Sequence, residues 1–282
     1  MKRRFIALVA LAFLASPFST PAQYSEATPA KKAVAPTATP AGPRISFNTV
    51  HAEGPYIALT FDDGPSKATT PRLLDLLAKR GIKATFFVLG ECVEANPDIL
   101  KREVAEGHEI GNHSWDHPNL AKKSDDAVRS QLQRTQDVIF QVAGIKPKVL
   151  RPPYGAFTDR QKKWANEQFG FKIAMWEVDP NDWKRPGPDV VAKRILSETR
   201  AGDIVLVHDI HSQTIDAMPQ VLDGLLAKGF KFVTVSELIA MDRPGTPKPS
   251  PSPAASPTPE ASPSPVAASP TPTPQPSKKK RH

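Results

Sequence analysis

The sequence of 282 residues contains a single cysteine, Cys92. One thiol cannot form an internal disulfide, and it cannot supply the several sulfur ligands of a multi-cysteine zinc or iron–sulfur site. The stability of the protein must therefore come from an ordinary hydrophobic core, which a chain of this length can bury. No base can be assigned to Cys92, so we expect a small buried hydrophobic side chain and not a nucleophile.

The central part of the sequence lacks net charge. Residues 1–43 and residues 244–282 each carry a net charge of +4, which accounts for the whole formal charge of +8, so the residues between them sum to zero. A folded domain that binds nucleic acid is expected to present a basic face. The charge distribution therefore argues against nucleic acid as a partner.

The apolar run near the N-terminus is too short to cross a membrane. Phe5–Ala15 spans about 17 Å as a helix at a rise of about 1.5 Å per residue, whereas a bilayer core is about 30 Å thick. The run follows Lys2-Arg3-Arg4 and precedes small residues, which is the pattern of a cleaved secretory signal peptide, assigned here to residues 1–22. We expect a protein secreted to the cell envelope, in the periplasm or the cell wall.

Proline is concentrated at the two ends of the chain. Of 31 prolines, 6 lie in residues 1–43 and 13 in residues 244–282. This composition predicts an Ala/Thr/Pro-rich linker over residues 23–50 and a disordered Ser/Thr/Pro-rich basic tail over residues 243–282, around one folded domain at residues 51–242. The tail is either a solvated spacer or a segment whose basic end associates with an anionic envelope polymer.

Short apolar runs alternate with amphipathic segments throughout this domain. The predicted strands are residues 56–61, 84–88, 108–111, 148–151, 171–176, 204–207 and 230–233. The predicted helices are residues 70–80, 97–106, 124–143, 158–169, 189–199 and 214–228, and a last helix begins at 236–240. The alternation indicates an α/β fold with a parallel sheet and right-handed crossovers, and it leaves open whether the sheet closes into a barrel.

Polar residues follow the predicted strands at the points where they end. They are Asp62 and Asp63, His113 and His117, Arg151, Asp179 and Asp182, and His208. In a parallel α/β fold these points lie on one face, where loops build active sites. We therefore expect the eight side chains to form one site.

The spacing of His113 and His117 indicates a metal site. On a helical turn, residues four apart share a face and can bind one ion, and two histidines with a carboxylate leave open the positions that a hydrolytic metal needs. Asp62 and Asp63 would face the same site only if the strand breaks between them, as Gly64 favours. One carboxylate would then bind the metal and the other would act as a base. An exposed histidine pair beside an acidic turn is the alternative.

The remaining polar residues suggest further roles. Arg151 could pair with Asp62 or with Asp182, either for catalysis or as a structural salt bridge. The two prolines after Arg151 would hold the backbone N–H of Tyr154 rigidly toward an oxyanion. His208 is placed to act as a general acid, and Asp182 could orient it and raise its pKa.

Five segments resemble, in order, the motifs of the NodB-type polysaccharide deacetylases, carbohydrate esterase family 4. They are Thr60-Phe61-Asp62-Asp63-Gly64-Pro65, His113-Ser114-Trp115-Asp116-His117, Arg151-Pro152-Pro153-Tyr154-Gly155, Asp179-Pro180-Asn181-Asp182-Trp183 and Leu206-Val207-His208. The resemblance spans residues 56–240. It implies a distorted (β/α)7 barrel, the NodB homology domain.

The resemblance also implies a role for each motif residue. Asp63, His113 and His117 would hold one divalent metal, usually zinc, with cobalt or another divalent ion as alternatives. Asp62 would be the base and His208 the acid. Arg151 would orient Asp62, and Asp182 would tune His208. Trp183 and Leu206 would line the pocket for the acetyl methyl group.

The implied activity is removal of N-acetyl groups from a cell-envelope polysaccharide. N-acetylglucosamine of peptidoglycan is the leading substrate, and chitin oligomers, xylan or an exopolysaccharide are the alternatives. A non-catalytic carbohydrate-binding module would be expected to have lost a ligand, the base or the acid, and all are present. We expect a monomer.

Overall fold

The structure of the protein, a computed structural model, describes residues 43–243. The predicted signal peptide, most of the predicted linker and the predicted tail beyond Arg243 lie outside the described residues. Within the described range, no helix combines the length and the apolar character needed to cross a membrane.

Eight strands form one sheet in this range, and all strand pairs are parallel. They are β1 (Ser46–Phe47), β2 (Tyr56–Asp62), β3 (Thr85–Val88), β4 (Glu109–Asn112), β5 (Val149–Leu150), β6 (Lys172–Ala174), β7 (Ile204–His208) and β8 (Lys231–Phe232). The order is β1-β6-β5-β4-β3-β2-β7, and β8 pairs with the first residues of β2.

The two ends of this sheet meet. Val178, in the segment after β6, forms a parallel bridge to Val205 of β7, and the Leu206 N–H donates to the Val178 carbonyl at 2.9 Å. Thr49, just after β1, bridges to Asp203. The sheet therefore closes on itself, and the predicted α/β barrel is confirmed.

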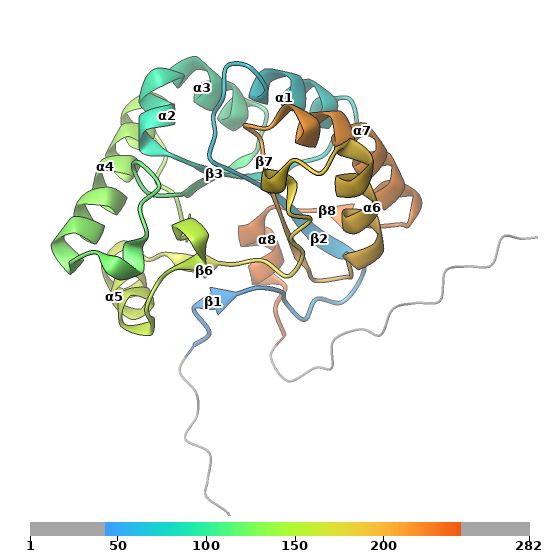
Figure 1. Cartoon of the computed structure of the whole chain (residues 1–282). Coiled ribbons are helices and arrows are strands. Elements are labelled where there is room, and N and C mark those ends of the chain that lie inside the picture. Colours follow the sequence, from blue (N-terminus) through green and yellow to red (C-terminus); the bar gives the residue numbers. More distant parts are fainter. Residues whose placement is uncertain (1–42, 244–282) are drawn as a thin grey trace, which may run out of the picture. The chain divides into compact units, whose positions relative to one another are not determined.

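Most of the helices cover the outside of the barrel (Figure 1). The helices are α1 (Thr70–Ala78), α2 (Gly90–Ala95), α3 (Pro97–Ala105), α4 (Asp125–Ala143), α5 (Asp159–Phe169), α6 (Pro188–Glu198), α7 (Ser212–Ala227) and α8 (Val235–Ala240), with short 3-10 turns η1 (Leu120–Lys122), η2 (Pro153–Gly155) and η3 (Asp182–Lys184). Figure 1 shows α4 and α5 on one side and α6 and α7 on the other.

Helix α4 shows how local sequence signals set the boundaries of an element. The Ser124 side chain accepts from the Ala127 N–H at the start of the helix, and Gly144 ends it in the left-handed region, with φ 71°. A serine at the N-cap satisfies a free backbone donor, and glycine adopts a positive φ without steric cost. Both ends of α4 agree with the sequence prediction.

Alternation along β2 separates the core from the site. Ile57, Leu59 and Phe61 pack outward in the main hydrophobic cluster with the helices, so Thr60 and Asp62 point into the barrel. Ala58 packs inside the barrel near the amino end of the strands, in a second hydrophobic cluster that includes residues of α8 and β1. The interior is therefore apolar at the amino end of the strands and polar at the carboxyl end.

The predicted linker needs a correction. Residues 23–50 were expected to lack structure, but β1 pairs with β6, and Phe47 and Val50 are buried. A two-residue strand is too short to show a hydrophobic period. The fold begins before residue 51, and it reaches Arg243, whose N–H donates to the His51 carbonyl at 3.0 Å.

The seven predicted strands correspond to β2–β8, mostly with shorter bounds. The sequence prediction missed α2 as well as β1. Helix α2 has only six residues and begins at Gly90 without a side-chain cap. It therefore carries none of the start signals that identified α4.

Candidate active site

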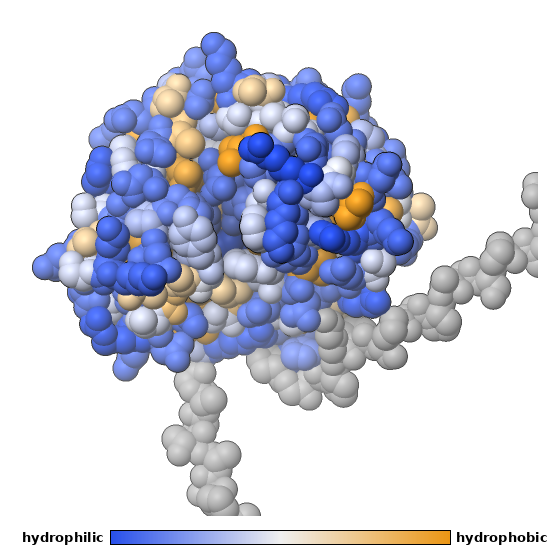
Figure 2. All heavy atoms as spheres, viewed as in Figure 1, coloured by the Kyte–Doolittle hydropathy of each residue, from blue (hydrophilic) through white to orange (hydrophobic). Residues whose placement is uncertain are grey.

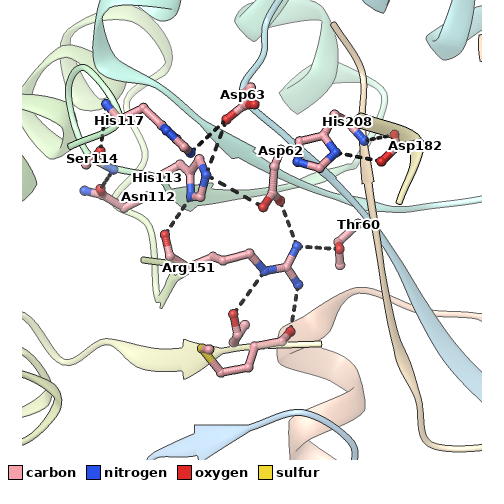
Figure 3. Close-up of polar contacts among 12 residues, drawn as sticks. Thr60, Asp62, Asp63, Asn112, His113, Ser114, His117, Arg151, Asp182 and His208 are labelled. Atoms are coloured by element: carbon pink, nitrogen blue, oxygen red, sulfur yellow. Dashed lines mark hydrogen bonds and ion pairs between the residues drawn. The ribbon is translucent and has the colours of Figure 1, made fainter. Parts of the chain in front are cut away.

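Asp62 and Asp63 face the same site because the strand ends between them. Asp62 is the last residue of β2 and is 3% exposed. Asp63 has φ 75°, in the left-handed region, which aspartate tolerates better than most residues. The expected break in the strand is confirmed, and it directs both carboxylates into the barrel mouth (Figure 3).

Asp63, His113 and His117 form a cluster that can hold a metal ion. The Asp63 Oδ1 atom lies 3.4 Å from His113 Nε2 and 3.5 Å from His117 Nε2, and the three ligand atoms lie within 4.8 Å of one another. Asp63 Oδ1 is buried and has no hydrogen-bond donor of ordinary geometry among the described residues. One carboxylate and two imidazoles are the donor set of a hydrolytic divalent site, so these residues fit such an ion.

The protonation states also suit metal binding. His113 Nδ1 lies 2.6 Å from the Arg151 carbonyl oxygen. Because a carbonyl can only accept, Nδ1 carries the proton, and the lone pair of Nε2 faces Asp63. Burial alone would raise the pKa of Asp63, but the nearby histidines, His113 first, lower it to about 2. Asp63 therefore stays ionised.

The two histidines do not lie on a helical turn, which corrects the sequence prediction. Strand β4 ends at Asn112, and the residues that follow form a loop in which Ser114 and His117 have positive φ values. The Ser114 N–H donates to Asn112 Oδ1 at 2.9 Å, and the His117 N–H donates to Ser114 Oγ at 3.2 Å. These bonds fold the loop back, and the two imidazole centroids lie 5.0 Å apart.

Arg151 lies inside the barrel with no exposed surface. Its Nη1 atom donates to Asp62 Oδ1 and to Thr60 Oγ1, both at 2.7 Å, while Nε and Nη2 donate to the carbonyls of Ala174 and Met175. Of the two pairings left open by the sequence, Arg151 thus pairs with Asp62. Because its donors are satisfied and its charge is paired, the buried guanidinium holds Asp62 in one orientation.

Asp182 holds His208 on the other side of the site. Asp182 Oδ1 lies 2.8 Å from His208 Nδ1, and Oδ2 accepts from the His208 N–H at 2.8 Å and from Thr214 Oγ1 at 2.7 Å. Burial lowers the pKa of His208, but the hydrogen bond and charge of Asp182, with smaller contributions from Asp62 and Asp63, raise it to about 9. His208 is therefore protonated at neutral pH, with its ring between Asp182 and Asp62 (Figure 3).

These side chains surround one pocket of about 560 Å³. Eight of the ten predicted site residues line it, namely Asp62, Asp63, His113, His117, Tyr154, Trp183, Leu206 and His208. Arg151 and Asp182 lie behind this lining, where they contact Asp62 and His208. All ten predicted residues are therefore brought together.

The aromatic residues lie at the mouth of the pocket. Tyr154 is 69% exposed and Trp183 is 50% exposed. The Tyr154 ring packs edge-on against His117, with 4.5 Å between centroids. Leu206, by contrast, is 5% exposed and contributes an apolar side chain to the lining of the pocket.

Three residues that support the site were not predicted. Thr60 accepts a hydrogen bond from Arg151, and Thr214 donates one to Asp182. Asp209, directly after His208, is fully buried. Asp209 accepts from Thr70 Oγ1, and burial raises its pKa to about 7. The two-residue period of β2 places Thr60 on the same face as Asp62, so the role of Thr60 could have been predicted from the sequence.

Cys92 is only partly buried, which corrects the expectation of a core position. Burial and nearby carboxylates raise the pKa of its thiol to about 11. The thiolate is therefore scarce at neutral pH, in agreement with the expectation that Cys92 is not a nucleophile.

A comparison with known sequences finds clear relatives. The family described as polysaccharide deacetylase matches residues 49–174. The chain is 47% identical over 182 residues to peptidoglycan-N-acetylglucosamine deacetylase PgdA of Listeria monocytogenes, covering 64% of this chain and 38% of that protein. It is 44% identical over 193 residues to a peptidoglycan-N-acetylglucosamine deacetylase of Bacillus cereus, covering 66% and 70%. The chain thus spans well under half the length of the Listeria relative.

Solved structures agree with this relationship. The peptidoglycan N-acetylglucosamine deacetylase Bc1960, in complex with a hydroxamate-type benzamide, superposes with a TM-score of 0.66 at 39% identity, covering 70% of this chain and 94% of that one. Fold, motif order and sequence identity agree. The chain therefore belongs to the polysaccharide deacetylase family, carbohydrate esterase family 4.

Proposed function

We propose that this protein is a metal-dependent hydrolase that removes N-acetyl groups from N-acetylglucosamine of peptidoglycan. The observation that carries the proposal is the arrangement of three kinds of group around one pocket. The three residues that can hold one metal ion and the carboxylate of Asp62 lie on one side of the pocket. The protonated His208 lies on the other side. Amide hydrolysis needs a Lewis acid, a base and an acid in this arrangement.

Asp63, His113 and His117 would hold the metal, with zinc as the first candidate and cobalt or another divalent ion as alternatives. When bound, the ion supplies Lewis acidity toward the acetamide carbonyl and the attacking water. Asp62 would take the proton of that water, in the orientation that Arg151 fixes. The backbone N–H of Tyr154 would stabilise the oxyanion.

His208 would complete the reaction by protonating the departing nitrogen. Asp182 supports this role because it keeps His208 protonated at neutral pH. Trp183 and Leu206 line the same pocket, and they would enclose the acetyl methyl group. The products are a free amine on the sugar and acetate.

The proposed location is the cell envelope. The basic, apolar and small residues of positions 1–22 support export, and the names of the related proteins support peptidoglycan as the substrate. We propose a secreted monomer whose basic tail is either a spacer or a contact to an anionic envelope polymer.

The test is acetate release by the full chain from three polymers in parallel. They are peptidoglycan glycan fragments, chitin oligomers and acetylated xylan, each assayed with zinc, with a chelator and after metal is restored. We expect metal-dependent release, fastest from peptidoglycan fragments. Release from chitin or xylan alone would show that this polymer, and not peptidoglycan, is the substrate. No release by a folded, metal-loaded protein would overturn the proposal.

A further inference from the structure

Among the residues that the structure describes, the side chain of Arg185 has no partner. Every other arginine within residues 43–243 contacts a carboxylate, a carbonyl or amide oxygen, or an aromatic ring through its guanidinium. Arg185 is exposed, and its guanidinium makes no such contact to the described residues. An arginine that presents its donors without a partner is available for a ligand.

Arg185 lies next to the catalytic groups. It directly follows η3, and its N–H donates to the Asp182 carbonyl at 2.8 Å. The backbone of Arg185 is in the left-handed region, with φ 55°, a conformation that costs a non-glycine residue free energy and is concentrated at functional sites. The strained turn therefore places Arg185 beside the residue that holds His208.

The charge of Arg185 also acts on His211, a neighbour of the proposed acid. Burial lowers the pKa of His211, and the charges of His208 and Arg185 contribute to the same shift. The His211 ring lies 5.8 Å from the His208 ring. The Arg185 charge thus acts within the surroundings of the proposed acid.

Two neighbours of Arg185 extend this surface. Trp183 is half exposed and lines the pocket, and Lys184 Nζ lies 4.6 Å from the centre of its ring. We call Trp183, Lys184 and Arg185 the cationic edge. Neither of its cations pairs with a carboxylate within the described residues, and the nearby Asp179 accepts instead from the Asn181 N–H at 2.7 Å. Figure 2 shows a hollow in this face with strongly hydrophilic side chains along one side.

We infer that the cationic edge is a carboxylate-binding subsite, with Arg185 as its main donor. A guanidinium binds a carboxylate through two parallel hydrogen bonds, and an exposed aromatic ring beside it can pack against a sugar. The ligand is the free lactyl carboxylate of a peptide-free N-acetylmuramic acid next to the reacting N-acetylglucosamine. The inference rests on the proposed function, and it identifies an anionic group that peptide-free peptidoglycan strands carry and chitin lacks.

The experiment compares two tetrasaccharides that differ in charge. One is the peptide-free tetramer of alternating N-acetylglucosamine and N-acetylmuramic acid, and the other is the neutral N-acetylglucosamine tetramer. Arg185→Ala should raise KM for the anionic tetramer about threefold to tenfold, the range of an exposed charge-assisted contact. The value of kcat, and KM for the neutral tetramer, should stay unchanged.

Control variants separate this effect from a general loss of charge. Arg185→Lys should recover part of the lost affinity, because lysine keeps the charge without the two-pronged geometry. Arg72→Ala removes another exposed arginine, paired with Asp216 in the wild type, and should leave both KM values unchanged. Added salt should raise KM of the wild type for the anionic tetramer only.

Binding separates failure of the subsite from failure of the proposed function. Calorimetry in an Asp62→Asn background measures the affinity for both tetramers without turnover. If Arg185→Ala binds the anionic tetramer more weakly, the subsite is supported, whether or not the wild type deacetylates either tetramer. If the wild type deacetylates neither, only the proposed function is overturned. Equal losses on both tetramers, no loss on the anionic one, or no binding of it at all would overturn the inference.

Discussion

Asp182 determines how strongly His208 holds its proton. We expect Asp182→Asn to lower the pKa of His208 from about 9 toward the usual value of about 6.5, since the asparagine keeps the size but removes the charge. His208 must be protonated to act as an acid. The alkaline limb of the kcat profile should therefore move to lower pH, and kcat at pH 8 should fall about tenfold or more.

The measurement is a pH profile of kcat combined with an NMR titration of the His208 ring. Thr214→Val is the matched control, because it removes one hydrogen bond to Asp182 and leaves the carboxylate charge in place. It should move the pKa of His208 less than Asp182→Asn does. An alkaline limb at the same pH in Asp182→Asn and wild type would show that Asp182 does not tune His208.

The metal cluster and the base should respond differently to single substitutions. Asp63→Ala and His113→Ala each remove one ligand of three, so we expect loss of bound metal together with activity. Asp62→Asn keeps an acceptor for Arg151 and leaves the cluster intact, so we expect full metal content with turnover reduced at least about a hundredfold. Metal analysis and acetate release on the same samples test both. Near-full turnover of Asp62→Asn would contradict its role as the base.

At the scale of elements, the turn after β2 depends on close packing between Gly64 and Asp209. A Cβ atom on Gly64 would lie 2.4 Å from Asp209 Oδ2, which is buried and already accepts from Thr70. Gly64→Ala should therefore push the turn away from β7 and displace the neighbouring Asp63. We expect a lower melting temperature and weaker metal binding.

Gly224→Ala in α7 is the control for this prediction. The atom nearest to its Cβ would be at the flexible end of the Leu196 side chain, at 2.7 Å, and alanine is a better helix former than glycine. Its melting temperature should change little, and its metal affinity should equal that of the wild type. If Gly64→Ala bound metal as tightly as Gly224→Ala, the proposed coupling between the turn and the site would be wrong.

The elements also show what could be predicted from sequence and what could not. The strand ends carry the motif residues, so the parallel order predicted where Asp62, His113 and His208 would meet. The predicted route by which His113 and His117 converge was wrong. The observed route depends on two positive φ values and on hydrogen bonds to the side chains of Asn112 and Ser114, and neither feature has a periodic signal. Strand β1 was missed because its stability comes from pairing with a distant strand.

At the scale of the whole molecule, β1 makes the domain larger than its motifs suggest. A chain of residues 51–243 begins at the predicted domain boundary and lacks Phe47 and Val50, which are 3% and 0% exposed. Each buried apolar side chain contributes about 1.5–3 kcal/mol, so the loss is a large part of the usual stability of a domain. We expect a melting temperature at least about 10 °C below that of residues 43–243.

Thermal unfolding of the two chains, followed by circular dichroism at one pH and without added metal, measures this difference. Phe47→Ala in the longer chain is the intermediate case, because it removes one of the two side chains and keeps the backbone pairing with β6. It should unfold between the two. Equal melting temperatures for the chains that start at residues 43 and 51 would show that β1 contributes nothing.

Arg151 connects two parts of the site through a single residue. Its carbonyl contacts the ring of His113, and its guanidinium holds the carboxylate of Asp62, whose Oδ2 lies 3.7 Å from His113 Nε2. A displacement of Arg151, which directly follows β5, therefore acts on the ligand and the base together. The distance between His113 and Asp62 should therefore fluctuate less than the position of either residue. Small motions of the barrel would then leave the spacing of the reacting groups unchanged.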